Sequence, residues 1–356
     1  MTERRKTKKI RVGNKYIGGD ASVTVQTMVK VDAHDVRAVV RQIKEEAEWG
    51  ADITRMNVLD MESVKNFGKI KKQIKIPIVA DIHFNYLWAI EAVKQGVDKL
   101  RINPGNIGGK ERVKAVVKVC KERGVPIRIG VNTGSLEKDL LEKYGGHPTA
   151  EAMVESAERH IKILEDLNFD QIVVALKSSD VRRMMKANRL FSRKYDYPLH
   201  LGVTEAGPPG KGTVKSSIGI GGLLEEGIGD TIRVSLTGDP REEIRAGREI
   251  LKSLGLKKGP VLISCPTCSR TQFEMLPLVE KVEEYLDKIE APIKVAVMGC
   301  VVNGPGEARE ADVGMAGGRG AGALFAKGKV IKPVKEKEMF KELKKAIDKV
   351  VKEKKG

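Results

Sequence analysis

The pattern of hydrophobic and polar positions repeats one unit along most of the chain, a short β-branched run followed by a longer amphipathic stretch. After the first run, apolar side chains recur at helical spacing from Val36 to Ile43, and Gly50 marks the end of the predicted helix. Such alternation indicates parallel strands joined by right-handed crossovers, and eight units predict a closed (β/α)₈ TIM-type barrel. The eight predicted strands are residues 22–29, 51–58, 76–83, 98–103, 126–132, 170–177, 197–205 and 230–236.

The repeat stops near the Gly/Lys/Pro-rich segment 255–260, and a different pattern follows it. Strand and helix signals then predict a smaller α+β domain that ends in a helix. Two domains are expected for 356 residues, because single hydrophobic cores stop growing at roughly 250–300 residues. The predicted elements are a strand at 261–265, a helix at 271–289, a strand at 293–300 and a hairpin at 323–332, and the predicted domains are residues 1–256 and 257–356.

The formal net charge of +17 raises the question of a nucleic-acid partner. Aromatic residues are only 4% of the chain, so stacking platforms are scarce, and the lysines are spread along predicted helix faces such as residues 65–75. We therefore expect no nucleic-acid partner, and a basic surface that attracts a small polyanion or an acidic protein. The basic start lacks an apolar signal region, and no apolar run is long enough to span a bilayer, so a cytoplasmic location and no membrane partner are expected.

Polar side chains gather where the predicted barrel strands end, which is where active sites lie in barrels of this type. Four arginines and one lysine are among them, and so many cations in one opening are costly unless an anion binds there. Because an arginine grips phosphate oxygens bidentately, these residues predict a substrate that carries one or two phosphate groups. The strand-end residues are Gln26, Arg55, Asn57, Asp81, His83, Arg101, Asn103, Arg128, Asn132, Lys177, Ser178, His200, Glu205 and Arg233.

The four cysteines separate into one predicted core residue and three candidate metal ligands. Cys120 shares a helical face with valines, which is typical of a core position. Cys265 and Cys268 form a CxxC pair, and Cys300 opens a Gly/Pro-rich segment of the same predicted domain. In a reducing compartment such a pair is more often catalytic or metal-binding than a structural disulfide.

Three cysteines without a fourth leave the kind of site open. A structural zinc site is usually closed by four Cys or His ligands, yet all five histidines precede the second domain. An iron–sulfur cluster with three thiolates tolerates an oxygen ligand on its fourth iron, and Glu307 is the carboxylate nearest to Cys300 in sequence. These arguments favour a cluster over zinc, with a dithiol redox pair as the third alternative.

Seven segments of the chain together resemble the 4-hydroxy-3-methylbut-2-enyl diphosphate synthase family, the iron–sulfur enzymes of the methylerythritol phosphate route to isoprenoids. The resemblance runs from about residue 8 to residue 330, covers both predicted domains and keeps the order of every motif. The segments are ADIHFN, LRINPGNIG, RIGVNTGS, HLGVTEAG, GIGDTIRVSLTGDP, SCPTCSR and GCVVNGPGEA.

This resemblance implies reductive ring opening and dehydration of 2-C-methyl-D-erythritol 2,4-cyclodiphosphate to 4-hydroxy-3-methylbut-2-enyl diphosphate, with two electrons passed through a [4Fe–4S] cluster. It implies a homodimer in which the cluster domain of one chain caps the barrel of the other, and reduced ferredoxin or flavodoxin as electron donor. It also implies that Glu205 handles protons in catalysis. The implied cluster ligands are Cys265, Cys268, Cys300 and Glu307, with Glu307 also catalytic, and the implied diphosphate ligands are Arg55, Arg101, Arg128, Asn132, Lys177 and Arg233. The predicted substrate-binding set adds the strand-end residues Asp81, His83, Ser178 and His200.

Two other functions are compatible with parts of the pattern. Lys177 ends the sixth predicted strand, where a Schiff-base aldolase acting on a sugar phosphate would place its lysine. That alternative leaves the three cysteines of the second domain unexplained. A basic nucleic-acid-binding protein with a zinc-stabilised second domain is the alternative that is not an enzyme.

Overall fold

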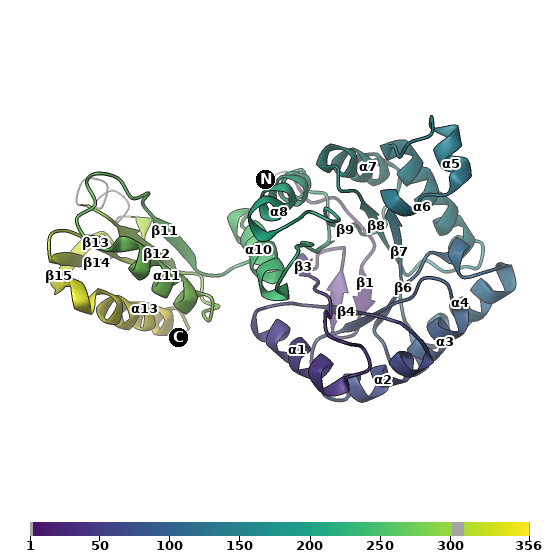
Figure 1. The fold of residues 1–356 in the computed structure, drawn as a ribbon, viewed down its shortest axis with the longest axis horizontal. Helices are drawn as coiled ribbons and strands as arrows, with labels where there is room; N and C mark the ends of the chain where they lie inside the picture. The colour runs from purple at the N-terminus through teal and green to yellow at the C-terminus, as the bar shows by residue number, and fades with distance from the viewer. Residues whose placement is uncertain (1–2, 301–309, 356) are drawn as a thin grey trace. The chain divides into compact units, whose positions relative to one another are not determined.

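The computed structural model describes residues 3–300 and 310–355 of the chain. It divides into two compact units, Met1–Lys257 and Lys258–Gly356 (Figure 1). None of the helices in the part of the chain that the structure describes is both long and apolar enough to cross a lipid bilayer. Each unit has its own hydrophobic core.

The first unit is the (β/α)₈ barrel that the sequence predicts. Two parallel sheets, of order β3-β10-β9 and β4-β5-β6-β7-β8, are joined by the bridges Gln26–Ile53 and Val174–Leu199, and these bridges close the barrel. Each strand falls inside one of the eight predicted runs but is shorter than that run. The strands are β3 (Thr24–Val25), β4 (Thr54–Asn57), β5 (Ile78–Asp81), β6 (Lys99–Arg101), β7 (Ile127–Asn132), β8 (Ile172–Lys177), β9 (His200–Leu201) and β10 (Thr231–Ile232).

Helices surround the barrel strands as an outer ring (Figure 1). Several of their starts are fixed by side-chain caps, as where Asp35 accepts a hydrogen bond from the backbone N–H of Ala38 at 3.0 Å. Helix α4 ends at Gly124, whose φ of 63° suits a residue without a side chain. The helices are α1 (Val36–Glu48), α2 (Met61–Lys71), α3 (Tyr86–Lys94), α4 (Lys110–Arg123), α5 (Lys138–Lys143), α6 (Ala150–Glu165), α7 (Val181–Lys194), α8 (Pro209–Ser216), α9 (Gly222–Glu225) and α10 (Pro240–Ser253).

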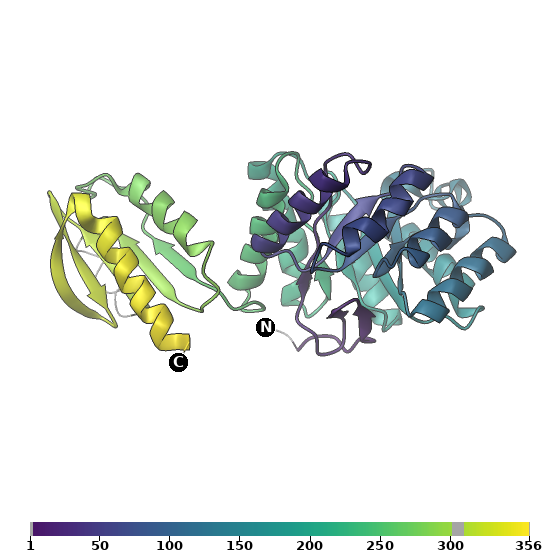
Figure 2. The same cartoon turned by 90° about the horizontal axis from the view of Figure 1, so that it is seen from below.

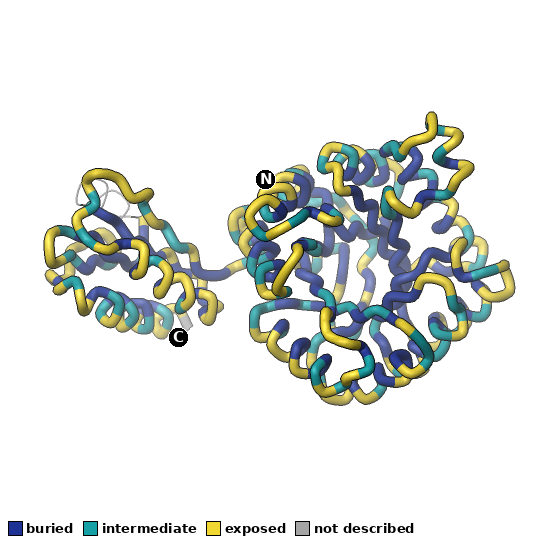
Figure 3. Tube along the Cα trace, viewed as in Figure 1, coloured by how far each residue is buried: buried dark blue, intermediate teal, exposed yellow. Residues whose placement is uncertain are grey.

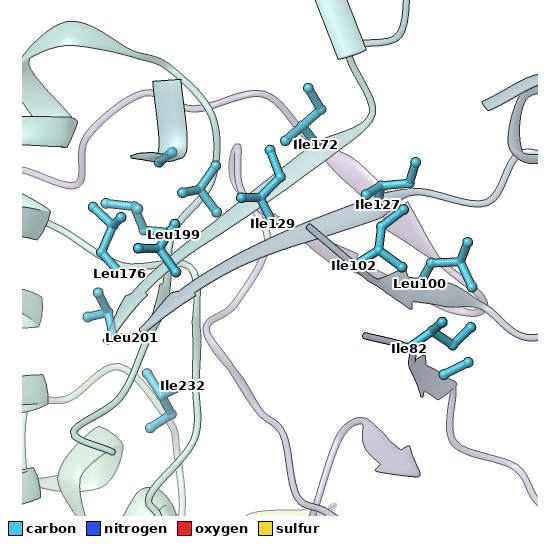
Figure 4. Packing of buried hydrophobic residues seen from close by; sticks show 14 of the residues in the cluster. Ile82, Leu100, Ile102, Ile127, Ile129, Ile172, Leu176, Leu199, Leu201 and Ile232 are labelled. Atoms are coloured by element: carbon cyan, nitrogen blue, oxygen red, sulfur yellow. The ribbon is translucent and has the colours of Figure 1, made fainter. Parts of the chain in front are cut away.

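The barrel strands present apolar side chains to the helices and polar side chains to the interior. Leu100 and Ile102 belong to the buried core between strands and helices (Figure 4), as do Ile127 and Ile129. Because side chains of a strand alternate between its two faces, the residues between these core positions point into the barrel. Apart from Arg55, Asn57 and Asn132, which are partly exposed, the residues of these strands are buried (Figure 3).

A hairpin that the sequence analysis did not predict closes the end of the barrel where the strands begin. Its strands β1 (Ile10–Val12) and β2 (Lys15–Ile17) pair antiparallel. The buried side chains of this hairpin pack against Ile53, Val79 and Val173, which lie near the starts of β4, β5 and β8 (Figure 2, dark purple). The hairpin therefore covers the end opposite to the carboxyl ends of the strands.

The second unit is a five-stranded sheet packed against two helices. Strands β11, β12 and β13 run parallel, whereas β14 and β15 continue the sheet as an antiparallel hairpin. The two predicted strands, the helix, the hairpin and the closing helix are all present, and β13 is an additional strand. The elements are β11 (Val261–Ser264), α11 (Met275–Leu286), β12 (Lys294–Met298), β13 (Val313–Gly317), β14 (Ala321–Ala326), β15 (Lys329–Lys335) and α13 (Met339–Lys355).

Candidate functional site

Basic side chains fill the interior of the barrel. Arg101, Arg128 and Lys177 are each less than a tenth exposed, although each carries a formal charge in water. Arg101 is directly opposite Arg128 in the register between β6 and β7. Neighbouring parallel strands point register partners to the same side, so these two cations lie side by side.

The structure corrects the expectation that all of these residues lie at strand ends. Asp81, Arg101 and Lys177 are the last residues of β5, β6 and β8, as predicted. Arg128, in contrast, is the second residue of β7, and His200 is the first residue of β9. Both are deeper in the barrel than predicted, because interior positions that are apolar in many barrels are polar here.

Asp81 is the carboxylate around which two of the arginines are arranged. Its oxygens lie 3.3 Å from Nε of Arg55 and 3.2 Å from Nη1 of Arg101. Burial alone would raise the pKa of Asp81, but Arg55, Arg101, Arg128 and His83 together hold it below its ordinary value. Asp81 is therefore an ionised counter-ion within the cation cluster.

Two glycines of the barrel strands leave room for the cations. A side-chain carbon on Gly130 would lie 2.6 Å from Nε of Arg101, and one on Gly202 would lie 2.8 Å from Nζ of Lys177. Arg101 donates a hydrogen bond to the carbonyl of Gly130 at 3.1 Å. Asn103, which follows β6, also binds Gly130. Its side chain donates a hydrogen bond to the carbonyl of Gly130 and accepts one from the N–H of Gly130.

Many polar nitrogen atoms of this cluster have no hydrogen-bond partner among the described residues. They include Nε and Nη2 of Arg128, Nε of Arg101, Nε of Arg233 and both ring nitrogens of His200. Burial lowers the pKa of Arg128, Lys177 and His200 well below ordinary values, and the neighbouring cations lower it further. Buried donors without partners are costly, so this interior is built for a ligand with several anionic oxygens.

The remaining predicted residues lie closer to solvent, apart from Ser178. His83 is half-exposed, and its Nδ1 accepts a hydrogen bond from Nη1 of Arg101 at 2.9 Å. Asn132 ends β7 and is partly exposed, whereas Ser178 is fully buried and accepts a hydrogen bond from the N–H of Asp180. Partial burial is the main cause that lowers the pKa of His83.

Glu205 has an unusual backbone. It is exposed in the loop after β9, and its φ of 52° is in the left-handed region. A residue with a side chain pays of order 1 kcal/mol or more for this conformation, and such strain is found most often at functional sites. The strain therefore marks this loop position as a candidate for function.

Two buried residues of the cluster were missed by the sequence analysis. Lys99 lies inside the barrel two residues before Arg101, and this period-two spacing was the available signal. Glu243 begins α10 and lies 3.4 Å from Nη2 of Arg233 and 3.1 Å from Nζ of Lys30. Glu243 comes from a helix, so a search restricted to strand ends does not find it.

In the second unit, the cysteines follow two neighbouring strands. Cys265 directly follows β11, and Cys300 lies two residues beyond β12, which is the parallel neighbour of β11. Sγ of Cys265 accepts a hydrogen bond from the N–H of Gly299 at 3.1 Å, so Cys265 lies beside the residue that precedes Cys300. Cys120 is buried in α4 of the barrel, as predicted, where burial raises the pKa of its thiol to about 12.

The surroundings of the three cysteines suit thiolate ligands. Cys268 is exposed, and the backbone N–H of Arg270 is the main cause that lowers the pKa of its thiol. Gly299 leaves room at Cys265, since a side-chain carbon there would lie 3.2 Å from its Sγ. Within the described residues, no three His, Cys, Asp or Glu side chains are close enough to hold a metal ion. The fourth predicted ligand, Glu307, lies outside the described residues.

Comparison with known protein families covers both units. The model of the GcpE TIM-barrel domain matches residues 7–248, and that of the GcpE protein C-terminal domain matches residues 261–349. The chain belongs to the GcpE family. The fold of the family, a TIM barrel with a C-terminal domain, is the fold that the sequence predicts.

Curated relatives support this assignment to the GcpE family over nearly the full length. A protein of Clostridium perfringens named 4-hydroxy-3-methylbut-2-en-1-yl diphosphate synthase (flavodoxin) is 58% identical over 97% of this chain and 99% of its own length. A protein of Thermodesulfovibrio yellowstonii with the same name is also 58% identical, over 96% of this chain and 98% of its own length. The relative from Geobacillus thermodenitrificans is 55% identical over 99% of this chain and 94% of its own length.

Solved structures resemble the barrel of this GcpE-family chain in fold alone. A dihydropteroate synthase from Coxiella burnetii has a TM-score of 0.52 at 13% identity and covers 69% of this chain and 97% of its own. The dihydropteroate synthase of Yersinia pestis has a TM-score of 0.51 at 11% identity, with 69% and 98% covered.

Replacing Gly130 with Ala tests whether room for Arg101 matters. The added methyl group would lie 2.6 Å from Nε of Arg101 and would displace its guanidinium. Because small displacements of binding groups are costly, we expect affinity for inorganic pyrophosphate to fall by about 10-fold or more, as measured by calorimetry. Gly134→Ala is the matched control, since nothing lies within 4 Å of the added carbon. Equal affinity of the two variants would remove Arg101 from the anion site.

Proposed function

We propose that this chain is an oxidoreductase that opens the ring of 2-C-methyl-D-erythritol 2,4-cyclodiphosphate and removes a hydroxyl group, giving 4-hydroxy-3-methylbut-2-enyl diphosphate. The observation that carries the proposal is the barrel interior, whose unpartnered Arg128 and His200 donors suit the oxygens of a diphosphate. Relatives of 55–58% identity, aligned over nearly their whole length, bear the name of this synthase. That name does not favour the aldolase alternative at Lys177.

The interior cations supply binding and charge stabilisation in this reaction. Arg55, Arg101, Arg128, Lys177 and Arg233 would hold the two phosphate groups, and Asp81 would keep Arg55 and Arg101 in place through its 3.3 and 3.2 Å contacts. As the ring C–O bond breaks, negative charge grows on the phosphate oxygen that leaves. Fixed cations in a buried site stabilise that charge without rearranging.

The side chains nearer to solvent would orient the substrate and handle protons. Asn132 and Ser178 follow the same two strands as Arg128 and Lys177, so their polar groups would face the carbon skeleton. His83, with Nδ1 accepting from Arg101, has Nε2 as its donor. Glu205 would donate a proton to the departing hydroxyl, which then leaves as water.

A [4Fe–4S] cluster in the second unit would be held by Cys265, Cys268, Cys300 and Glu307. When bound, such a cluster supplies single electrons and Lewis acidity, which removal of an oxygen from carbon requires. The fit is supported by the N–H of Gly299, which donates to Sγ of Cys265 at 3.1 Å, because such hydrogen bonds stabilise a thiolate ligand.

The partners follow from the same chemistry. We infer a reduced flavodoxin or ferredoxin as electron donor, since these are acidic proteins and the chain carries a net charge of +17. We also infer a homodimer in which the cluster domain of one chain caps the barrel of the other. Exposed apolar side chains that follow β3, β4 and β5 support a covered barrel mouth. Val31, Leu59 and Phe84 lie in loops, and Leu87 lies in the first turn of α3.

Turnover of the cyclic diphosphate by the reduced, anaerobic protein tests the activity directly. Arg128→Met keeps the bulk of the side chain but removes its charge, so we expect catalytic efficiency to fall on the order of 10²- to 10³-fold. Arg123→Met, on the exposed end of α4, makes the same change outside the site. Product formation at the wild-type rate by Arg128→Met would exclude Arg128, and no product from the wild type would overturn the function.

Metal analysis tests the cluster ligands. We expect about four irons and four sulfides per chain in the anaerobically purified protein. Cys300→Ser should lose most of this iron because one thiolate anchor is gone, and its visible absorption should fall in parallel. Cys120→Ala should keep the full iron content, since Cys120 is buried in the barrel core. Zinc in place of iron would contradict the cluster.

Mixing two inactive variants tests the proposed dimer, in which the cluster domain of one chain caps the barrel of the other. Glu205→Ala damages only the barrel site, and Cys300→Ala damages only the cluster site. If domains are exchanged between chains, each heterodimer has one intact site, and random mixing restores about a quarter of wild-type activity. If each cluster domain serves its own barrel, the heterodimer has no intact site, so an inactive mixture with verified subunit exchange would disprove the arrangement.

A further inference from the structure

Lys99 makes a contact that spans the interior of the barrel. It is the first residue of β6, and none of its surface is exposed. Its Nζ lies 3.4 Å from Oε1 of Gln26, which directly follows β3. Strands β4 and β5 separate β3 from β6, so this contact does not join neighbouring strands. The head of Lys99 therefore lies inside the barrel, among the groups of the cation cluster.

The charges that face Lys99 from inside the barrel are mainly positive. Arg128 on β7 and Arg55 on β4 both disfavour a charge on its amine. Asp98 favours a charge on the Lys99 amine. Its carboxylate, however, accepts a hydrogen bond from the N–H of Ile78 at 2.8 Å and forms an ion pair with Lys71. Lys99 forms no ion pair with any carboxylate among the described residues.

The other ionisable groups of the interior do not supply a counter-ion for Lys99. Asp81 on β5 already pairs with Arg55 and Arg101. Lys177 on β8 and His200 on β9 are also buried, and the charges of Lys177 and Lys99 both disfavour protonation of His200. Arg233, which directly follows β10, is paired with Glu243. Among the residues that the structure describes, no carboxylate is thus paired with Lys99.

A buried amine without a counter-charge gives up its proton. Burial is the largest cause that lowers the pKa of Lys99 well below its ordinary value, and Arg128 and Arg55 follow. An ammonium group here would lose its hydration without gaining a counter-ion, whereas the neutral amine can remain beside Gln26 at much lower cost. The full burial of Lys99 and the cations beside it therefore favour the neutral amine in the protein without ligand.

An anion in the interior reverses this balance. Nε2 of Gln26 and Nε of Arg128 have no partner among the described residues, and neither ring nitrogen of His200 has one, so the oxygens of an anion would satisfy the donors among these buried groups. Resting on the function proposed above, we infer that Lys99 is a further substrate-binding residue, which takes up a proton from solvent when the substrate diphosphate enters the barrel. The proton adds to the lone pair of the amine, no bond to substrate forms, and release of the product returns the proton.

Calorimetry of substrate binding tests this proton uptake. The anaerobic holoprotein is titrated without reductant in buffers of different ionisation enthalpy, so that the observed heat reports the protons taken up. Lys99→Met should lower the uptake by about one proton and weaken binding on the order of 10²-fold. Because methionine replaces an unpaired buried amine, the variant should also unfold at an equal or higher temperature than the wild type. A purely structural lysine would show the opposite, a lower unfolding temperature with unchanged proton uptake.

Gln26→Glu provides a second variant that keeps the lysine. The new carboxylate would lie against Nζ of Lys99, where Oε1 of Gln26 is now. Either Lys99 is then already charged, or the carboxyl group holds the proton that Lys99 needs. In both cases the proton is within the pair before substrate binds, so we expect the uptake from solvent to disappear.

Two ligands separate this inference from the proposed function. Titrations use the cyclic diphosphate and, in parallel, inorganic pyrophosphate, with each variant compared to the wild type so that protonation of the ligand itself cancels. If pyrophosphate binds and the cyclic diphosphate does not, the proposed function fails, while pyrophosphate still reports on Lys99. Uptake that persists at the wild-type level in Lys99→Met belongs to Lys177 or His200 and overturns the inference. Absence of uptake in the wild type, or of binding by either ligand, overturns it as well.

Discussion

Repulsion among the cations inside the barrel is the constraint on which the rest of the first unit depends. Asp81 neutralises part of the charge of Arg55 and Arg101, and Glu243 does the same for Arg233 from α10. Arg128 has no such partner among the described residues, so the free protein retains uncompensated charge. An anion that binds in this interior, as proposed above, would offset that uncompensated charge.

Such an interior must be stabilised from elsewhere in the barrel. The alternation of the strands contributes to this, because most residues that flank the inward cations along the strands are apolar and pack under the helices. Arg128, for example, lies between Ile127 and Ile129, both fully buried. Full burial of such a side chain contributes about 1.5–3 kcal/mol, and the outer core contains dozens of them. The cost of the site is thus offset by side chains on the opposite face of the same strands.

The sequence was sufficient for the fold because this alternation is a local property. Period-two and period-3.6 patterns predicted each barrel strand and the ring of helices. Local patterns failed where tertiary contacts decide, as in β13, which the sequence did not predict. Gly314 and Gly317 weaken the strand pattern there, and they are required because Phe325 and Phe273 approach them closely. The site shows the same limit of local patterns. The predicted strand ends place Asp81 and Arg101 at the mouth of the barrel, but their ion pair depends on the register between β5 and β6. Register is set by packing of the whole barrel, so a single sequence does not reveal it.

Glycine has the same structural role in both units, because it lets another group approach the backbone closely. Gly130 and Gly202 admit arginine and lysine heads into the barrel, and Gly299 admits Sγ of Cys265 beside β12. None of these three has a positive φ, so their backbones would accept any residue, and glycine is required only by what approaches them. In a sequence such positions look like weak points of a strand. In the structure, Gly130 leaves volume for the head of Arg101 alone, so substitution there acts on function first. An added carbon at Gly202 would also meet the backbone carbonyl of Arg233 at 2.6 Å, and one at Gly299 the hydroxyl of Thr271 at 2.8 Å.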